Sequence, residues 1–196
     1  ESEQFVLDSL CQQVDYLSQD LERHLLGNHL FVNAKALMFA GCFFDGDVAD
    51  KWLKTGLSIY NKELNEQVLA DGGNYELTPM YHVIMLVDLL DLINLFNAYP
   101  ERVSVSVLDE TKSIAIKMLV WLERMSHLDN KISFFNDATF CIAPENDVVF
   151  NYAKTLGLVW QSDSLESLQV HDLKDTGYVS VKNSEFSLIC DYHHLL

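Results

Sequence analysis

The residues best suited to chemistry lie close together between positions 71 and 82, in the run DGGNYELTPMYH. This run holds two carboxylates, Asp71 and Glu76, with two phenols, one imidazole and one amide. Carboxyl, phenol and imidazole groups transfer protons in enzymes, so the run could perform general acid–base catalysis. The paired glycines and Pro79 indicate an ordered connection that leads into a helix, because Gly reaches backbone angles closed to other residues and Pro suits a first helical turn.

The same run also has a purely structural interpretation. Thr78 is placed to cap the following helix, and Glu76 lies near the positive end of its dipole. A different enzymatic interpretation is a glycoside hydrolase on an α/α barrel, with Asp71 and Glu76 as acid and base or nucleophile. A third is a glycan-binding or scaffold protein without turnover. The residues of the run leave these alternatives open.

Helical periodicity surrounds the run on both sides, with apolar residues at steps of three and four. Gly27 is predicted to end the first helix, and Asn28 to cap the second. The helix after Pro79 is apolar nearly all round, so it should be an inner, buried one. In order, the helices form three αα-hairpins, and their predicted spans are about 7–25, 29–41, 47–68, 79–96, 114–125 and 146–156.

The period changes to two after Trp160, which predicts antiparallel strands at about 168–173, 178–182 and 186–190. Three strands alone would leave an edge and a face exposed, so we expect more chain to follow. The predicted fold class is mainly α: hairpins of an incomplete (α/α) toroid at 1–160, then the beginning of an antiparallel β-domain at 161–196. A helical repeat scaffold is the competing architecture.

Composition narrows the choice of partners. The 196 residues include 29 acidic and 13 basic ones, and the net charge of −16 argues against nucleic acid and anionic membranes. A polyanionic substrate would need a locally different site. The four cysteines are far apart and give neither a zinc signature nor a disulfide framework, so we expect no metal or cofactor. Asp88 and Asp91 interrupt the longest apolar run, which argues against membrane insertion.

Several motifs follow one another along the chain: Gly27-Asn28-His29-Leu30, AKALMFAGCFF at 34–44, DGGNYELTPMYH at 71–82, and Phe134-Phe135-Asn136-Asp137 followed by Ala143-Pro144. In this order they resemble the bacterial heparinase II/III family of polysaccharide lyases. The resemblance covers roughly residues 20 to 192. It implies an incomplete α/α toroid followed by antiparallel β-sandwich layers, with an acidic polysaccharide held in the cleft between them.

The reaction implied by the resemblance is β-elimination on a uronic-acid-containing polysaccharide. The C5 proton of a uronate is barely acidic while the carboxylate is ionised, so the site must neutralise the charge that develops there. The resemblance assigns this role to Asn28, and that of general acid to Tyr81, which would also be the base in a syn elimination. Because phenol has an ordinary pKa of about 10, a base role would need help from the site.

Further residues are expected to contact the substrate. Val32 stands where the family often has an acidic residue three positions after the histidine, which argues against a carboxylate partner for His29. His82 is next to Tyr81 and is also compatible with a place behind it or in the core. The set predicted to bind substrate is His29, Glu76, His82 and Asn136.

The sequence also carries expectations about the whole protein. The second catalytic base should lie beyond Leu196, because His193 and His194 do not match the family's histidine motif. We therefore expect these 196 residues alone to be inactive or very weak. A periplasmic or secreted location is expected from the kind of substrate.

Overall fold

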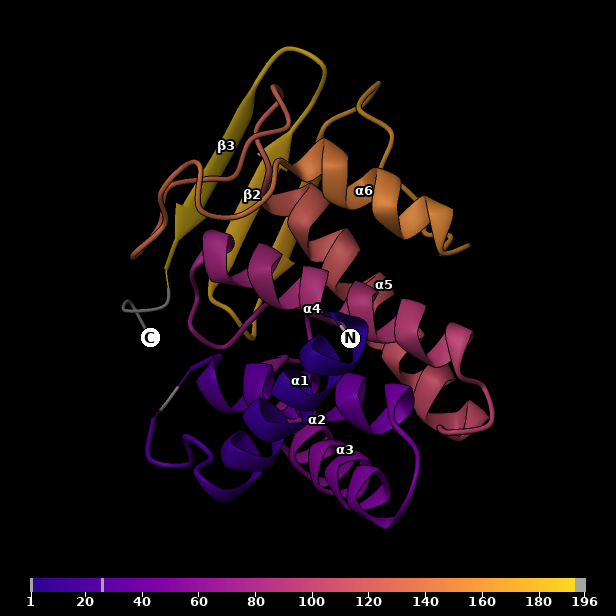
Figure 1. Ribbon diagram of the computed structural model, residues 1–196. Helices are drawn as coiled ribbons and strands as arrows, with labels where there is room; N and C mark the ends of the chain where they lie inside the picture. Colours follow the sequence, from indigo (N-terminus) through magenta and orange to yellow (C-terminus); the bar gives the residue numbers. More distant parts are fainter. Residues whose placement is uncertain (1, 26, 193–196) are drawn as a thin grey trace. The chain divides into compact units, whose positions relative to one another are not determined.

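The computed structural model describes residues 2–25 and 27–192, and Figure 1 shows its helices followed by its strands. His193 and His194 lie outside the described residues. The mainly α fold class with a terminal antiparallel sheet is confirmed. The elements are α1 Ser2–Gln19, α2 His29–Phe43, α3 Asp47–Gln67, α4 Pro79–Ala98, α5 Val105–Met125, α6 Asn146–Thr155, β1 Gln169–Leu173, β2 Tyr178–Lys182 and β3 Ser187–Asp191.

The chain divides into two compact units, residues 1–66 and 67–196. The expected boundary at residue 160 lies where the helices are followed by strands. Helices α4, α5 and α6 belong to the same compact unit as the sheet.

In the first unit, α1 packs against α2, and α2 lies very close to α3. A Cβ atom at Gly41 would lie 2.6 Å from the Cβ of Leu53, and one at Gly56 would lie 2.7 Å from the Cγ of Met38. These two glycines therefore allow the close approach of α2 and α3, as the small residues of the sequence predict. Helix α1 ends at Gln19, earlier than expected, because the next segment leaves the helix to bond with α2.

In the second unit, α4 is the inner helix. Both α5 and α6 pack against it, and its buried residues lie on all sides, which confirms the prediction from its apolar sequence. Contrary to the expectation from Asp88 and Asp91, α4 is long and apolar enough to cross a membrane by length and composition. In the apolar stretch of 18 residues within α4, 72% is buried inside the protein. Packing against α5 and α6 therefore accounts for its apolar composition.

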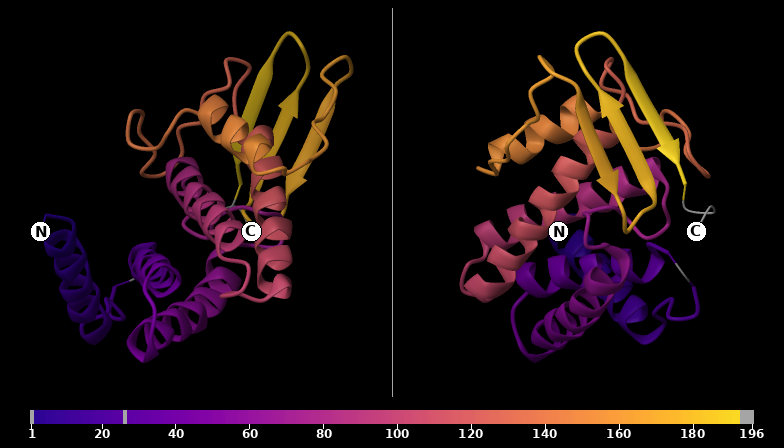
Figure 2. Two further views of the ribbon diagram at one scale, coloured as in Figure 1. Left: turned by 45° about the vertical axis from the view of Figure 1, so that its right-hand side comes forward. Right: turned by 180° about the vertical axis from the view of Figure 1, so that it is seen from behind.

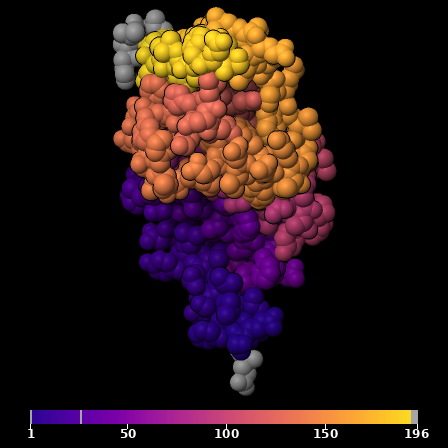
Figure 3. Space-filling view, turned by 90° about the horizontal axis from the view of Figure 1, so that it is seen from above, coloured from indigo at the N-terminus to yellow at the C-terminus, as the bar shows by residue number. Residues whose placement is uncertain are grey.

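The sheet has the order β1-β2-β3, and both strand pairs are antiparallel. Val170, Val181 and Leu188 are paired across it on the outer face, where Val170 and Leu188 are exposed. Tyr178 and Ser180 of the inner face are fully buried. Figure 2 shows the three strands side by side, with α5 running up to the sheet, and Figure 3 shows the salmon and orange segments between α5 and β1 next to the yellow β3.

The end of α5 is attached to the inner face of β2 by hydrogen bonds. The Ser180 hydroxyl donates to the carbonyl of Arg124 at 2.7 Å, and the Lys182 ammonium donates to the carbonyls of Glu123, at 2.8 Å, and Ser126. The last carbonyls of a helix have no partner within the helix. The inner face of the sheet supplies the missing donors, so the sheet and α5 form one packed body.

The connection between α3 and α4 is compact and lies against α5. Val68 and Asn74 form an antiparallel bridge that closes the loop between them. A Cβ atom at Gly72 would lie 2.5 Å from the carbonyl oxygen of Lys117, and one at Gly73 would lie 2.2 Å from the Cγ2 of Thr176. The paired glycines predicted an ordered connection, and the structure shows that they permit this contact.

We expect the substitution Gly73→Ala to lower the free energy of unfolding by about 1–3 kcal/mol, because the added methyl group overpacks a filled site. The comparison variant is Gly46→Ala, where a Cβ atom would meet nothing within 4 Å and only the positive φ of 98° opposes the change. Denaturant unfolding of both variants measures the difference. An equal or smaller loss for Gly73→Ala would contradict the close contact.

Candidate functional site

Asp71 fastens the connection before α4 to the turn between β1 and β2. Its Oδ1 accepts a hydrogen bond from the backbone N–H of Gly73 at 3.0 Å. Its Oδ2 accepts from both the backbone N–H and the hydroxyl of Thr176, each at 2.8 Å. Both carboxylate oxygens are thus used to hold the fold. This placement argues against the alternative in which Asp71 and Glu76 are the carboxylate pair of a glycoside hydrolase.

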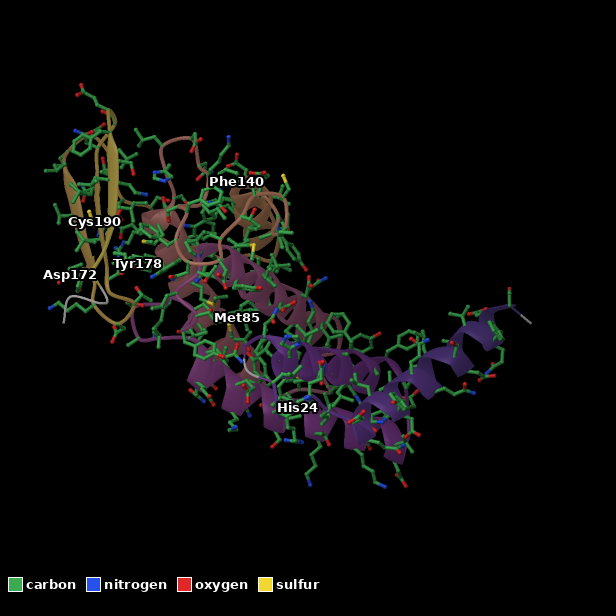
Figure 4. The ribbon with its side chains drawn as sticks, turned by 90° about the vertical axis from the view of Figure 1, so that its left-hand side faces the viewer. His24, Met85, Phe140, Asp172, Tyr178 and Cys190 are labelled. Atoms are coloured by element: carbon green, nitrogen blue, oxygen red, sulfur yellow. The ribbon has the colours of Figure 1, made fainter. Side chains whose placement is uncertain are left out.

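The carbonyl of Leu77 is a second fixed point of the same connection. It accepts hydrogen bonds from the Tyr178 hydroxyl and from Nδ2 of Asn136, both at 2.7 Å. Leu77 and Asn136 have positive φ values of 55° and 52°, which are uncommon for residues other than Gly. Burial, and secondarily the charge of Asp191, raises the pKa of Tyr178 above its ordinary value, so this phenol stays a donor. In Figure 4, Tyr178 lies on the side of the sheet that faces the helices of its unit.

Thr78 takes the N-cap position of α4, as predicted, but its side chain does not cap the helix. Its hydroxyl donates instead to the carbonyl of Glu76 at 3.1 Å. The backbone N–H of Glu76 in turn donates to the side chain of Asn74 at 3.0 Å. The turn before α4 is therefore fixed by bonds within the run 71–78 as well as by Tyr178 and Asn136.

Tyr81 lies in the first turn of α4, directly after this fixed turn, and is partly exposed. Its hydroxyl makes no hydrogen bond to another residue in the part of the chain that the structure describes. Asn136, by contrast, is exposed but its amide nitrogen is engaged by Leu77. Three of the residues predicted in this unit are associated with the connection before α4. Glu76 is part of it, Tyr81 follows it in α4, and Asn136 donates a hydrogen bond to it at Leu77.

His82 has a different place from the substrate contact expected for it. It is fully buried, its Nε2 donates to the carbonyl of Met118 at 3.0 Å, and its ring lies 4.3 Å from that of Trp121. A carbonyl only accepts, so the proton is assigned to Nε2. Burial lowers the pKa of His82 to about 3. A neutral imidazole buried in the core packs against α5 and has no surface at which to meet a polysaccharide.

The first unit holds the other two predicted residues. Asn28 stands at the N-cap position of α2, but its backbone is helical and its side chain makes no capping hydrogen bond. The predicted capping role is therefore wrong, and the amide is not used to close the helix. His29 begins α2, and its Nδ1 lies 3.7 Å from Oε1 of Glu22. The carboxylate near His29 is thus supplied by an earlier residue in the chain, not by position 32.

The sequence did not indicate that two side chains, Thr176 and Tyr178, belong to this site. Thr176 and Tyr178 looked like parts of a turn and a strand, yet they hold Asp71 and Leu77 from about a hundred positions away. The run Asp175-Thr176-Gly177 predicted the turn but carried no signal of its partner. Among the described residues, no group of three or more His, Cys, Asp or Glu side chains is placed to hold a metal ion.

Comparison with known proteins adds the evidence of kinship. A family model described as "Heparinase II/III N-terminus" matches residues 3–165. A heparin-sulfate lyase from Bacteroides stercoris is 32% identical over 133 residues, which is 64% of this chain and 18% of the relative. A heparin-sulfate lyase from Pedobacter heparinus is 42% identical over 78 residues, which is 39% of this chain and 12% of the relative.

Solved structures show the same fold. A crystal structure of heparinase III matches 93% of this chain with a TM-score of 0.71 at 20% identity. Heparan sulfate lyase HepC from Pedobacter heparinus matches 94% with a TM-score of 0.65 at 22% identity. The chain spans less than a fifth of the length of these curated relatives and about a third of the solved chains, since it covers 31% of the first and 30% of the second.

We expect Tyr178→Phe to loosen the turn before α4, because the Leu77 carbonyl loses one of its two donors while the aromatic packing remains. The loss should be about 1 kcal/mol in the free energy of unfolding, with faster amide hydrogen exchange over residues 77–82. The matched control is Tyr192→Phe, which removes an exposed phenol that donates to Asp172 at 2.6 Å. Equal exchange in both variants would speak against the bond to Leu77 as a fixed point.

The buried His82 predicts a dependence of stability on pH. Its folded pKa of about 3 lies below the ordinary value of 6.5, so between these values the unfolded chain binds a proton that the folded chain excludes. The free energy of unfolding should therefore fall as pH falls from 6.5 toward 3, by up to about 1.4 kcal/mol per pH unit. Urea unfolding at several pH values gives the free energy of unfolding as a function of pH. In His82→Gln this free energy should depend less steeply on pH than in the unchanged protein. An equally steep dependence would show that folded His82 does not exclude the proton.

Proposed function

The chain belongs to the heparinase II/III family, and from this premise we propose that the full-length protein is a polysaccharide lyase. Its substrate is a uronic-acid-containing acidic polysaccharide, in keeping with the heparin-sulfate lyases that the chain is similar to. The reaction is a β-elimination that breaks the glycosidic bond and leaves an unsaturated uronate. The protein is periplasmic or secreted, where such polymers occur.

The proposed chemistry begins with the C5 proton of the uronate. Its removal places negative charge on the adjacent carboxylate, and a hydrogen-bond donor aimed at that group lowers the barrier. Asn28 fills this role, since an amide donates without adding a charge of its own. The absence of a capping hydrogen bond from its side chain to α2 supports the assignment, because the amide is not already used there.

Tyr81 is proposed as the general acid that protonates the leaving glycosidic oxygen, and in a syn elimination also as the base. The observation that carries the proposal is its setting: a partly exposed phenol, bonded to no other described residue, directly after a turn fixed by Asp71, Tyr178 and Asn136. Proton transfer requires a donor held in one geometry. Glu76, His29 and Asn136 are proposed to contact the polymer, and His82 to position Tyr81.

The decisive experiment follows the ultraviolet absorbance of unsaturated uronate when the full-length protein is mixed with a panel of acidic polysaccharides. We expect activity on a uronate polymer, with kcat lowered about 10²-fold or more by Tyr81→Phe and about 10²–10³-fold by Asn28→Ala. Tyr99→Phe, at the opposite end of α4, is the matched control and should keep full activity.

Other outcomes would redirect the assignment. New reducing ends without ultraviolet absorbance would mean hydrolysis. Neither signal with any polymer would favour a glycan-binding protein without turnover. Full activity in Tyr81→Phe would remove Tyr81 from the chemistry while leaving a lyase.

A further inference from the structure

The first unit carries a groove that the proposed catalytic residues do not use. The groove has a volume of about 330 Å³ and lies between the segment before α2, the first turn of α2 and the part of α3 from Lys54 to Glu63. Leu30 and Ile59 form an apolar part of its wall. Three cationic side chains line it: Arg23, Lys54 and Lys62. Figure 4 labels His24, the neighbour of Arg23 in the same segment.

This gathering of cations runs against the charge of the whole chain, which is −16. Residues 1–66 contain five basic and eleven acidic side chains. Three of the five basic ones line the groove, whereas Glu63 is the one carboxylate among its lining residues. A solvated helix face would be expected to mix both signs, so the groove is a local exception of the kind that a polyanionic ligand needs.

The carboxylate nearest in sequence to Arg23 is occupied by other partners. Glu22 accepts a hydrogen bond from Nδ2 of buried Asn33 at 2.9 Å, and its backbone N–H donates to Oδ1 of the same amide at 2.9 Å. Its other carboxylate oxygen lies 3.7 Å from His29. These contacts attach the segment before α2 to Asn33 of α2, and so hold the backbone next to Arg23 in place.

The three cations differ in their internal partners. Lys62 lies 3.5 Å from Glu63 and 3.9 Å from Glu66, so its charge is partly neutralised. Arg23 and Lys54 form no ion pair with the residues that the structure describes. Two positive charges therefore face the groove without an internal counter-charge, with the hydroxyl of Ser58 beside them.

We propose that this groove binds the sulfate or carboxylate groups of an acidic polysaccharide, as a subsite apart from the reacting sugar. A guanidinium group binds sulfate and carboxylate with two parallel hydrogen bonds, and an ammonium group adds a mobile point charge. The volume is at the lower end of the roughly 300–1,000 Å³ that is typical of sites for small ligands, which suits a short stretch of a sugar chain. The inference rests on the proposed function for the identity of the polymer.

The position of the groove agrees with this role. Leu30 in its wall is two residues from Asn28, within the first turn of α2. The proposal is that a polymer whose uronate lies at Asn28 continues past the start of α2 into the groove. The groove holds a neighbouring part of the chain and takes no part in the proton transfers.

The test measures binding separately from turnover. Full-length protein carrying Tyr81→Phe is titrated with heparan sulfate by calorimetry, with and without the double substitution Arg23→Gln and Lys54→Gln. We expect the double substitution to raise Kd about tenfold and to reduce the slope of log K against log salt by roughly one to two, since each neutralised anion releases a counterion. The matched control, Lys35→Gln with Lys51→Gln, removes the same charge from the same unit outside the groove and should change Kd less than twofold.

Three results would overturn the inference. Equal weakening by the control pair would show that only overall charge matters. Equal affinity for a DNA oligonucleotide of similar charge would show a site for any polyanion, without preference for a polysaccharide. With the catalytic tyrosine restored, an unchanged KM in the Arg23 and Lys54 variant of an active lyase would also contradict it. If the protein has no lyase activity but its binding of heparan sulfate depends on Arg23 and Lys54, the proposed function is wrong and the polysaccharide subsite is supported.

Discussion

The buried end of α5 is the constraint on which the second unit depends. A helix that ends inside a protein exposes carbonyls that have no partner in the helix, and each must find a donor. Ser133 donates to the carbonyl of Met125 at 2.9 Å, and Ser180 and Lys182 of β2 donate to the carbonyls around it. Lys182 is buried, and burial lowers its pKa to about 8. These bonds hold the inner face of the sheet against the end of α5.

Once the sheet is fixed, the turn that leads to Tyr81 is fixed as well. Trp121 of α5 packs beside Tyr178 of β2 and donates to Thr176 at 3.2 Å, and Thr176 in turn holds Asp71. The same packing places the Tyr178 hydroxyl on the Leu77 carbonyl. Tyr81, which is proposed to transfer protons, thus follows a backbone turn that the β-sheet holds in place. Such support keeps the geometry of a reacting side chain precise.

The residues proposed to act in the reaction and in binding are found in both units. Residues 1–66 contribute Asn28 and the cationic groove, and residues 67–196 contribute Tyr81 and its supports. The acidity of the chain as a whole would repel an acidic polymer, and the proposed subsite places Arg23 and Lys54 where they would offset that repulsion locally. Long-range repulsion is screened by salt within about 10 Å, so a few uncompensated cations can decide where such a polymer binds.

The sequence by itself determined the elements and their order, since periodicity depends only on which face of each helix or strand is buried. It identified α4 as the inner helix and the run 71–82 as an ordered turn. Tertiary structure alone decided the role of each polar side chain there. Asp71 holds the turn between β1 and β2, and His82 is a core residue, because hydrogen-bond partners come from segments distant in sequence. Outside the run, Asn28 does not cap α2. Residue type and local spacing carry no record of such partners, and only the packed chain brings Thr176 to Asp71 and Tyr178 to Leu77.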